Sequence, residues 1–259
     1  MKAMILAAGL GTRLRPLTND RPKALVELDG RTLLEIVVTR LASFGVSEFI
    51  VNVHHFADQV VSYLASKRNF GFRIELSRED DLLLDTGGGL KQASWFFLED
   101  NLRLDEPFLL HNVDVLSGID LAKMLRFHSQ QQALATLAVQ PRASSRQLLF
   151  GKDLQLGGRV KNNQEVSMDS RAKKGTASPP VRSSLERLAF CGVHVISPGL
   201  LPLLSETAPV FSIIDSYLRL ASDGHKILGF RADKYYWKDL GRPADLTQAA
   251  LDLRRNPQA

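Results

Sequence analysis

The opening of the chain is the feature that most restricts the fold. A short apolar run at residues 2–8 stops at the glycine turn of residues 9–11, and the cations Arg13, Arg15 and Lys23 follow. A buried strand that ends at glycines is typical of the first βα unit of a parallel sheet. Glycines let the backbone approach an anion, and arginine binds phosphate oxygens in a fork. The opening therefore predicts a turn that holds phosphate groups.

Short apolar runs and helical patterns alternate through the first half of the chain. This alternation predicts βαβ units, a mainly parallel sheet and helices on both of its faces. In such folds, ligands bind at the carboxyl ends of the strands. The expected strands are residues 2–8, 48–53, 72–77, 107–112 and 135–140, and the expected helices are residues 32–44, 58–67, 90–97 and 121–132.

The pattern changes after Pro141, where we expect a smaller subdomain packed on the first part of a single domain. Residues 161–184 are polar and rich in Ser, Lys and Pro, which predicts a flexible loop. The expected strands are residues 146–150, 156–160 and 188–196, and the expected helices are residues 212–222 and 240–255.

Composition limits the possible partners. The net charge of +5 suits a polyanionic ligand. The sequence has no run of five or more basic residues and no basic strip interleaved with aromatic residues, so we expect no nucleic-acid partner. It has no stretch of 18 apolar residues, and its opening apolar run is too short for a signal peptide. We therefore expect a cytoplasmic protein without a membrane span.

The single cysteine and the lack of zinc-binding motifs limit the possible chemistry of the chain. Cys191 is the only cysteine, which excludes an internal disulfide, and its apolar surroundings predict a buried core residue. The sequence contains no CxxC and no HExxH motif, so nothing supports a zinc site.

The glycine turn matches neither of two common phosphate-binding motifs. A dinucleotide-binding turn would have glycine where Leu14 stands, and a P-loop would close with Gly-Lys-Ser/Thr. Taken alone, the turn is also compatible with a tight strand–helix connection that carries solvated arginines.

The glycine turn belongs to a longer signature, which is made of several segments along the chain. Residues 6–18, LAAGLGTRLRPLT, and residues 22–26, PKALV, are followed in order by DTGGG at 85–89, NVD at 112–114, FCGV at 190–193 and WKDLG at 237–241. Together these segments resemble the sugar-1-phosphate nucleotidyltransferases, also called nucleotide-sugar pyrophosphorylases. The resemblance spans nearly the whole chain and is weakest at 141–187. It is most similar to the N-acetylmuramic acid 1-phosphate uridylyltransferase branch, with heptose- and mannose-1-phosphate nucleotidyltransferases as close competitors.

The resemblance implies an α/β fold of the three-layer Rossmann-like nucleotidyltransferase type, with a mainly parallel mixed sheet and a small sugar-side subdomain. Residues 1–259 would form one domain, with a nucleotide-binding part at 1–140 and a sugar-binding and C-terminal part at 141–259. The implied reaction is Mg²⁺-dependent transfer of a nucleotidyl group from a nucleoside triphosphate to a sugar 1-phosphate, with release of pyrophosphate.

The resemblance also implies roles for individual residues. Arg13 would hold the departing pyrophosphate, and Lys23 would lie between the two phosphate groups. The expected metal ligands are Asp114 and Asp239, although the family has Gly-Asp where this chain has Val113-Asp114. The expected nucleotide-binding residues are Leu6, Ala8, Gly9, Gly11, Thr12, Arg13, Glu79, Thr86, Gly87 and Gly88, of which residues 86–88 lie in a glycine-rich turn. The expected sugar-binding residues are Asn112, Arg146, Gly192 and Asp215.

Some alternatives stay open at this point. UTP is the favoured nucleotide and GTP the next, while CTP and dTTP are not excluded. A catalytically inactive nucleotide-sugar-binding regulatory module would have the same fold, as would a nucleotidyltransferase that acts on a non-sugar phosphate. A glycosyltransferase of related fold would not need the glycine turn and Pro-Lys pair. The sequence does not indicate an oligomeric state.

Overall fold

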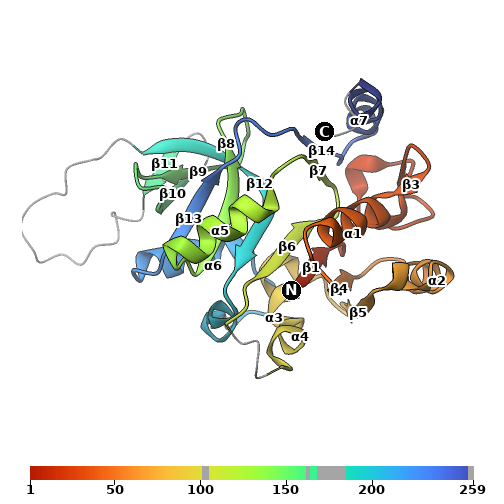
Figure 1. Cartoon of the computed structure of the whole chain (residues 1–259), viewed down its shortest axis with the longest axis horizontal. Coiled ribbons are helices and arrows are strands. Elements are labelled where there is room, and N and C mark those ends of the chain that lie inside the picture. The colour runs from red at the N-terminus through yellow and green to blue at the C-terminus, as the bar shows by residue number, and fades with distance from the viewer. Residues whose placement is uncertain (101–104, 162–163, 168–184, 256–259) are drawn as a thin grey trace, which may run out of the picture.

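The computed structural model describes residues 1–100, 105–161, 164–167 and 185–255 (Figure 1). The strands of its main sheet are β1 (Lys2–Leu6), β4 (Glu48–Val53), β5 (Arg73–Arg78), β6 (Phe108–Asn112), β8 (Ala135–Gln140), β9 (Gln147–Phe150), β10 (Leu156–Lys161), β11 (Gln164–Ser167), β12 (Glu186–Ile196) and β13 (Ile227–Arg231). In the described residues their order is β11-β10-β9-β12-β6-β1-β4-β5, and β8 pairs with both β12 and β13.

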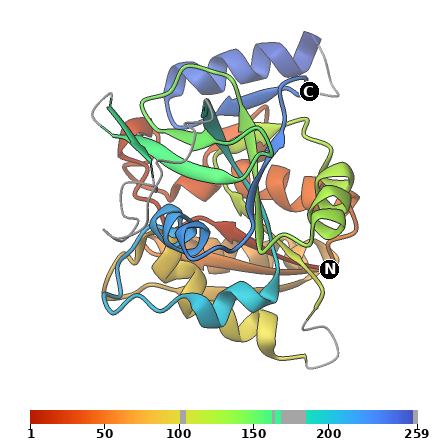
Figure 2. The same cartoon turned by 90° about the vertical axis from the view of Figure 1, so that its left-hand side faces the viewer.

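The α-helices are α1 (Leu33–Ser43), α2 (Ala57–Ser66), α3 (Asp85–Gln92), α4 (Ser94–Leu98), α5 (Leu121–Gln131), α6 (Ile213–Ser222) and α7 (Pro243–Arg255). Residues from α1, α2, α5 and α7 contribute to one hydrophobic cluster, and residues from α3, α4 and α6 contribute to the other. In Figure 2 the yellow helices α3 and α4 lie at the bottom and the blue helix α7 lies at the top, with the sheet between them. This arrangement confirms the three-layer α/β fold.

Strand direction differs between the two halves of the sheet. In the first half, β6, β1, β4 and β5 are parallel neighbours, as the alternating pattern predicts. In the second half, β12 runs antiparallel to β6, β8 and β9, and among the described strands there only β8 and β13 pair in parallel. The description as mainly parallel therefore fits the first half alone.

The expected loop at 161–184 is only partly described. Contrary to the prediction, residues 164–167 form β11, which pairs antiparallel with β10. Residues 162–163 and 168–184 lie outside the described residues. Polar composition gave no strand signal here because β11 lies at the edge of the described sheet, where the side chains of residues 164–166 are exposed.

The three glycines at 87–89 are a second correction, because they belong to helix α3 rather than to a turn. Glycine is a poor helix former, but here close packing requires it. A Cβ atom on Gly87 would lie 2.3 Å from the ring of Phe211, and one on Gly88 would lie 2.2 Å from the carbonyl oxygen of Pro209. The glycines therefore let α3 lie directly against the chain that leads into α6.

Two short strands form a separate ribbon beside the main sheet. They are β7 (Val115–Ser117) and β14 (Trp237–Asp239), and they pair antiparallel with Asp239 opposite Val115. The backbone N–H of Leu240 also donates to the carbonyl oxygen of Asp114 at 2.8 Å. The ribbon thus brings the backbones of two signature residues, Asp114 and Asp239, together although they lie far apart in the chain. A second ribbon joins β2 (Glu27–Leu28) and β3 (Arg31–Thr32).

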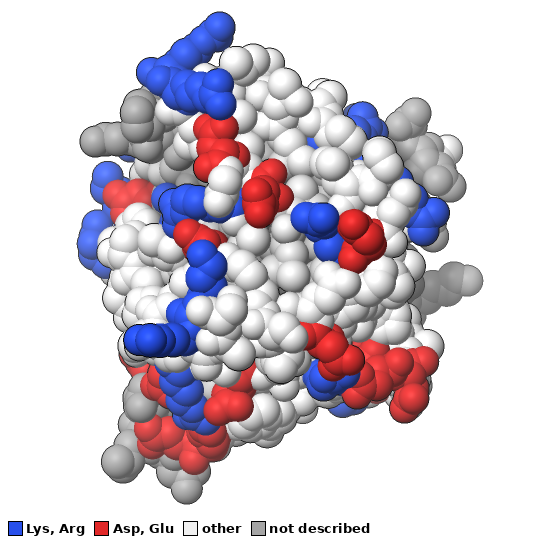
Figure 3. Space-filling model, turned by 90° about the vertical axis from the view of Figure 1, so that its right-hand side faces the viewer, with Lys and Arg blue, Asp and Glu red and all other residues white. Residues whose placement is uncertain are grey.

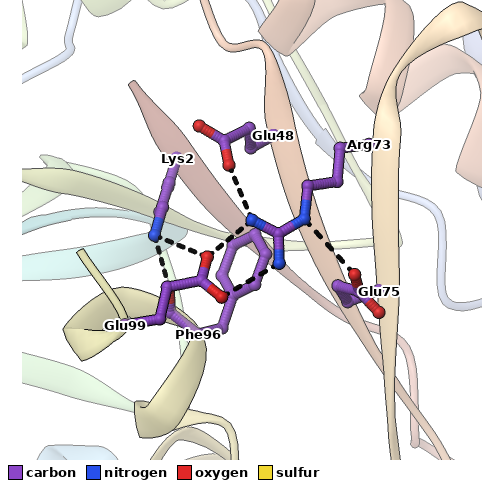
Figure 4. A network of polar contacts seen from close by, with 6 residues as sticks. All are labelled: Lys2, Glu48, Arg73, Glu75, Phe96 and Glu99. Carbon is purple, nitrogen blue, oxygen red and sulfur yellow. Dashed lines mark hydrogen bonds and ion pairs between the residues drawn. The ribbon is translucent and has the colours of Figure 1, made fainter.

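A network of charges joins α4 to the strands of the first half (Figure 4). The guanidinium group of Arg73 on β5 donates to both carboxylate oxygens of Glu99, at 2.6 and 2.9 Å. The ammonium group of Lys2 on β1 donates to Glu99 and to the carbonyl oxygen of Phe96. Both cations also contact the ring of Phe96. Nζ of Lys2 lies 4.9 Å from the ring centroid, and Cζ of Arg73 lies 5.2 Å from it.

Surface charge is mixed on the face shown in Figure 3, where basic and acidic side chains lie next to one another. The absence of a nucleic-acid partner stays a prediction. No helix among the described residues is both long enough and apolar enough to cross a membrane.

Candidate active site

A cavity of about 530 Å³ opens where β1, β4, β5 and β6 end. Its walls include the predicted site residues Leu6, Ala8, Gly9, Lys23, Glu79, Thr86, Asn112, Asp114 and Arg146. Sequence reasoning missed Asn52, Leu83, Asp85, Val113 and Val210, which also line it. The carboxyl edge of the parallel strands is where ligands bind in folds of this class.

Lys23 and Asp114 form an ion pair in the wall of this cavity. Each side chain is only 13% exposed. Lys23 begins a 3₁₀ turn (Lys23–Leu25), while Asp114 lies between β6 and β7. Gly11 leaves room for Lys23 at this position. It has a left-handed φ of 63°, and a Cβ atom on it would lie 3.3 Å from Cβ of Lys23.

Arg13 and Asp239 form a second, more exposed pair. The Nη2 atom of Arg13 lies 3.8 Å from Oδ2 of Asp239, and the two side chains are 56% and 42% exposed. The backbone N–H of Gly241 donates to Oδ1 of Asp239 at 2.6 Å. A Cβ atom on Gly241 would lie 2.5 Å from Arg13 Nη2 and 2.6 Å from Asp239 Oδ1. Only glycine fits beside this pair without displacing it.

The donor chemistry at this edge fits a shared divalent cation. The ribbon brings together Asp114 and Asp239, which offer two carboxylates. No group of three or more His, Cys, Asp or Glu residues that could hold a metal ion occurs among the described residues. Mg²⁺ is commonly bound by one or two carboxylates, with phosphate oxygens and water completing its six ligands. These two aspartates suit a metal that arrives with a phosphorylated substrate.

Asn52 and Glu79 form a buried polar pair in the wall of the same cavity. Both residues are only 2% exposed. Nδ2 of Asn52 donates to Oε1 of Glu79 at 2.5 Å, and the backbone N–H of Leu84 donates to Oε2 at 2.8 Å. Oδ1 of Asn52 accepts a hydrogen bond from the backbone N–H of Ala7 at 2.8 Å. Burial raises the pKa of Glu79 above its ordinary value, and the two donors oppose that shift.

Several predicted nucleotide-binding residues do not line the cavity. Gly11, Thr12 and Arg13 form the turn beside it, and Gly11 precedes the 3₁₀ turn Thr12–Leu14. The backbone N–H groups of Gly87 and Gly88 donate to the carbonyl oxygen of Phe211, at 2.9 and 3.3 Å. In this structure, those two amides therefore hold α3 against the start of α6.

The predicted sugar-binding residues divide in a similar way. Asn112 and Arg146 line the cavity, and Gly192 lies against Asn112, since a Cβ there would be 2.9 Å from Asn112 Nδ2. Asp215 lies away from them on α6, where its exposed carboxylate pairs with Arg159. The structure therefore brings Asn112, Arg146 and Gly192 together and leaves Asp215 apart.

Trp237 and Cys191 help to position the strand that carries Gly192. Nε1 of Trp237 donates to the carbonyl oxygen of Cys191 at 2.7 Å, and the guanidinium group of Arg142 stacks 3.6 Å from the ring centroid of Trp237. The Cys191 side chain is fully buried, as expected, and burial raises its pKa to about 12. A thiol with such a pKa is not a nucleophile at neutral pH.

Comparison with known proteins identifies relatives of the chain. The family model "Nucleotidyl transferase" matches residues 2–165. An N-acetylmuramate alpha-1-phosphate uridylyltransferase of Caulobacter vibrioides is 34% identical, over 93% of this chain and 92% of the relative. A mannose-1-phosphate guanylyltransferase of Mycobacterium tuberculosis is 30% identical over 98% of this chain, which spans 64% of that longer protein.

Solved structures share the same fold. HddC from Yersinia pseudotuberculosis, in a complex with GMP-PN, superposes with a TM-score of 0.72 at 20% identity. The match covers 97% of this chain and 99% of the HddC chain. At this level of identity, the likeness supports the architecture of the sheet and its helices.

Proposed function

Because the chain belongs to the nucleotidyl transferase family, among the sugar-1-phosphate nucleotidyltransferases, we propose that its cavity transfers a nucleotidyl group to a sugar 1-phosphate. An oxygen of the sugar phosphate attacks the α-phosphorus of a nucleoside triphosphate. A phosphorus–oxygen bond forms there, the bond to the β-phosphate breaks, and pyrophosphate leaves with the electron pair. The nucleophile is already an anion, so the reaction needs no general base.

One observation carries this proposal: two cations and two aspartates face each other at the edge of the cavity as Lys23–Asp114 and Arg13–Asp239. The reaction brings two polyanions together, and its transition state spreads negative charge over several oxygens. Such a reaction is accelerated chiefly by positioning and by fixed charges. In this proposal Lys23 holds the reacting phosphates, and Arg13, at the exposed rim, holds the departing pyrophosphate.

The proposed metal is Mg²⁺, held by Asp114 and Asp239. When bound, it would act as a Lewis acid that neutralises charge on the phosphate oxygens. Asp114 and Asp239 would hold the metal, and Lys23 and Arg13, which pair with them in this structure, would then be available to phosphate oxygens.

The cavity divides into two ends in this proposal. Asn52 and Glu79 lie at the nucleotide end, where their buried hydrogen bonds fix the shape that a base would meet. UTP is the proposed nucleotide, supported by the 34% identical uridylyltransferase, and GTP is the next candidate, supported by the guanylyltransferase relative. Asn112, Gly192 and Arg146 form the sugar end.

The test is pyrophosphate release from a matrix of nucleoside triphosphates and sugar 1-phosphates, with Mg²⁺ and with EDTA. We expect release that requires both substrates and the metal, and that is fastest with UTP. Release without any sugar 1-phosphate would indicate hydrolysis. No release from any pair, combined with tight binding of a nucleotide sugar by calorimetry, would favour a binding module instead.

A further inference from the structure

Strand β12 has a bulge next to the sugar end of the cavity. Phe190 pairs with Val139 of β8, and the next paired residue of β12 is His194, opposite Leu137. Three residues of β12 therefore span a single residue of β8, and Gly192, with a left-handed φ of 73°, lies among them. A bulge leaves backbone groups outside the ladder of the sheet, and buried groups of that kind need other partners.

One stacked pair of side chains, Arg142 and Trp237, supplies those partners. Nη2 of Arg142 donates to the carbonyl oxygen of Phe190 at 2.6 Å. Nε1 of Trp237 donates to the carbonyl oxygen of Cys191 at 2.7 Å. Cζ of Arg142 lies 3.6 Å from the ring centroid of Trp237, so each side chain fixes the other while both hold the bulge. A planar guanidinium group can stack on a ring and donate from its edge at the same time, which a lysine ammonium group cannot do.

Trp237 also belongs to the ribbon that carries Asp239. Both residues lie on β14, two positions apart, so their side chains point to the same face of the ribbon. Val115 of β7 lies opposite Asp239. A Cβ atom on Gly192 would lie 2.8 Å from Cγ2 of Val115 and 2.9 Å from Nδ2 of Asn112, so the bulge packs against both. The stacked pair therefore joins the wall of the sugar end to the ribbon of the proposed metal ligand.

The contacts of Arg142 are those of a group that is used for its shape. Its side chain is half-buried, and in the part of the chain that the structure describes no ion pair joins it to an aspartate or glutamate. A methionine of similar length could pack on the ring of Trp237 but would leave the carbonyl oxygen of Phe190 without its hydrogen bond. The role of Arg142 thus depends on a guanidinium group that is stacked and hydrogen-bonded at once.

We propose that Arg142 is a positioning residue, which acts through Trp237 to hold the bulge of β12 and the ribbon with Asp239 in one fixed arrangement. This inference rests on the proposed function, because that function assigns the two walls to the sugar and to the metal. Loss of the stacked pair should weaken binding at both walls. The nucleotide end, with Asn52 and Glu79, should keep its affinity.

The test measures binding as well as turnover, with the full chain. Calorimetry in EDTA gives the dissociation constants of UMP and of the nucleotide sugar that the wild type forms in the substrate matrix. Mn²⁺ titration followed by electron paramagnetic resonance gives the metal affinity. We expect Arg142→Met to raise the dissociation constants of the nucleotide sugar and of Mn²⁺ by about 10-fold each, and to leave that of UMP unchanged. Arg142→Lys should recover only part of the loss, because lysine lacks the planar group.

Trp237→Phe tests whether the two side chains act as one unit. It keeps a ring and removes the donor to Cys191. The double variant with Arg142→Met should bind the nucleotide sugar about as weakly as the weaker single variant, because residues in contact give effects that do not add. Additive losses would show that the two side chains act separately and would overturn the proposal.

Arg219→Met is the matched control. Arg219 of α6 also donates to a backbone carbonyl, that of Leu203 at 2.7 Å, and it does not line the cavity. Its loss should lower the midpoint of thermal unfolding and change none of these dissociation constants. The same result for Arg142→Met would make Arg142 merely structural, and a matching loss of UMP affinity would show a general distortion; either would overturn the inference and leave the proposed function intact. No turnover of any substrate pair by the wild type would overturn the proposed function, and this inference with it.

Discussion

The ammonium group of Lys23 and the carboxylate of Asp114 neutralise each other in a setting where each side chain is only 13% exposed. A largely buried pair of this kind leaves a strongly unfavourable charge behind when one partner is removed. In the proposed reaction, Asp114 would hold the metal and Lys23 would hold the triphosphate, in place of this ion pair. Binding of the metal and of the nucleotide should therefore be coupled, because each releases the residue that the other needs.

Replacement of Lys23 tests this relationship. Lys23→Met should lower kcat by about 100- to 1000-fold, because a fixed cation on the reacting phosphates is lost. It should also raise the affinity for Mn²⁺ in the absence of nucleotide, because Asp114 loses its cation. Steady-state kinetics and Mn²⁺ titration followed by electron paramagnetic resonance measure the two effects. Lys67→Met, at an exposed lysine that pairs with Glu35, is the control. Near-normal turnover in a folded Lys23→Met protein would remove Lys23 from the mechanism.

Gly241 offers a test of positioning. Gly241→Ala should lower kcat/KM by about 10- to 100-fold, because its Cβ would displace Arg13 and Asp239 from their present places. The midpoint of thermal unfolding should change little, since the pair is exposed. Gly199→Ala is a matched control, because a Cβ there meets no atom within 4 Å. Equal activity of the two variants would show that the Arg13–Asp239 geometry does not matter.

Asn52 should affect both stability and nucleotide binding. Asn52→Ala leaves Oε1 of Glu79 without its hydrogen bond in a buried place, while the backbone N–H of Ala7 keeps its bond to the carbonyl oxygen of residue 52 at 3.2 Å. The free energy of unfolding, measured in urea, should fall by about 1–3 kcal/mol. The KM for the triphosphate should rise as the nucleotide end loses its shape. An unchanged KM in a destabilised variant would assign Asn52 to structure alone.

The Glu99 network predicts a specific pH dependence of stability. The hydrogen bonds from Arg73, assisted by Lys2, lower the pKa of Glu99 from 4.5 to about 2. The stabilisation is therefore complete above pH of about 4.5 and is lost as the pH falls toward 2. Glu99→Gln should lower the midpoint of thermal unfolding by about 2–4 °C at pH 6, and the difference from wild type should disappear near pH 2. A difference that persists at pH 2 would show that packing, not charge, is responsible.

Local sequence patterns predicted the buried strands well because these strands are apolar on both faces. β1, β4 and β6 coincide with short apolar runs to within two residues. The expected helix at 90–97 overlaps the end of α3, but the start of α3 at residues 85–89 was missed because glycine disfavours helices. The contacts that require glycine there come from Pro209 and Phe211, far along the chain. Local sequence patterns do not predict contacts between residues that lie so far apart in the chain.

The candidate site shows the same difference between local sequence patterns and contacts made by residues far apart in the chain. Lys23 and Asp114, which both line the cavity, were predicted from the signature segments PKALV and NVD. Asn52 was missed because one polar residue at the end of an apolar strand is common, and its partner Glu79 follows a different strand. The pairing of β7 with β14, which brings Asp239 to Asp114, joins residues more than a hundred positions apart in the chain. Signature residues were therefore predictable, whereas the contacts that hold them depend on the completed fold.

The most direct measurement of the central claim follows the phosphorus atoms. The wild-type protein is incubated with Mg²⁺, a sugar 1-phosphate and UTP labelled in either its α- or its γ-phosphate. Attack at the α-phosphorus predicts that the α-label appears in the nucleotide sugar and the γ-label in pyrophosphate. Transfer of the γ-label to the sugar, or an α-label found only in free UMP, would contradict the account.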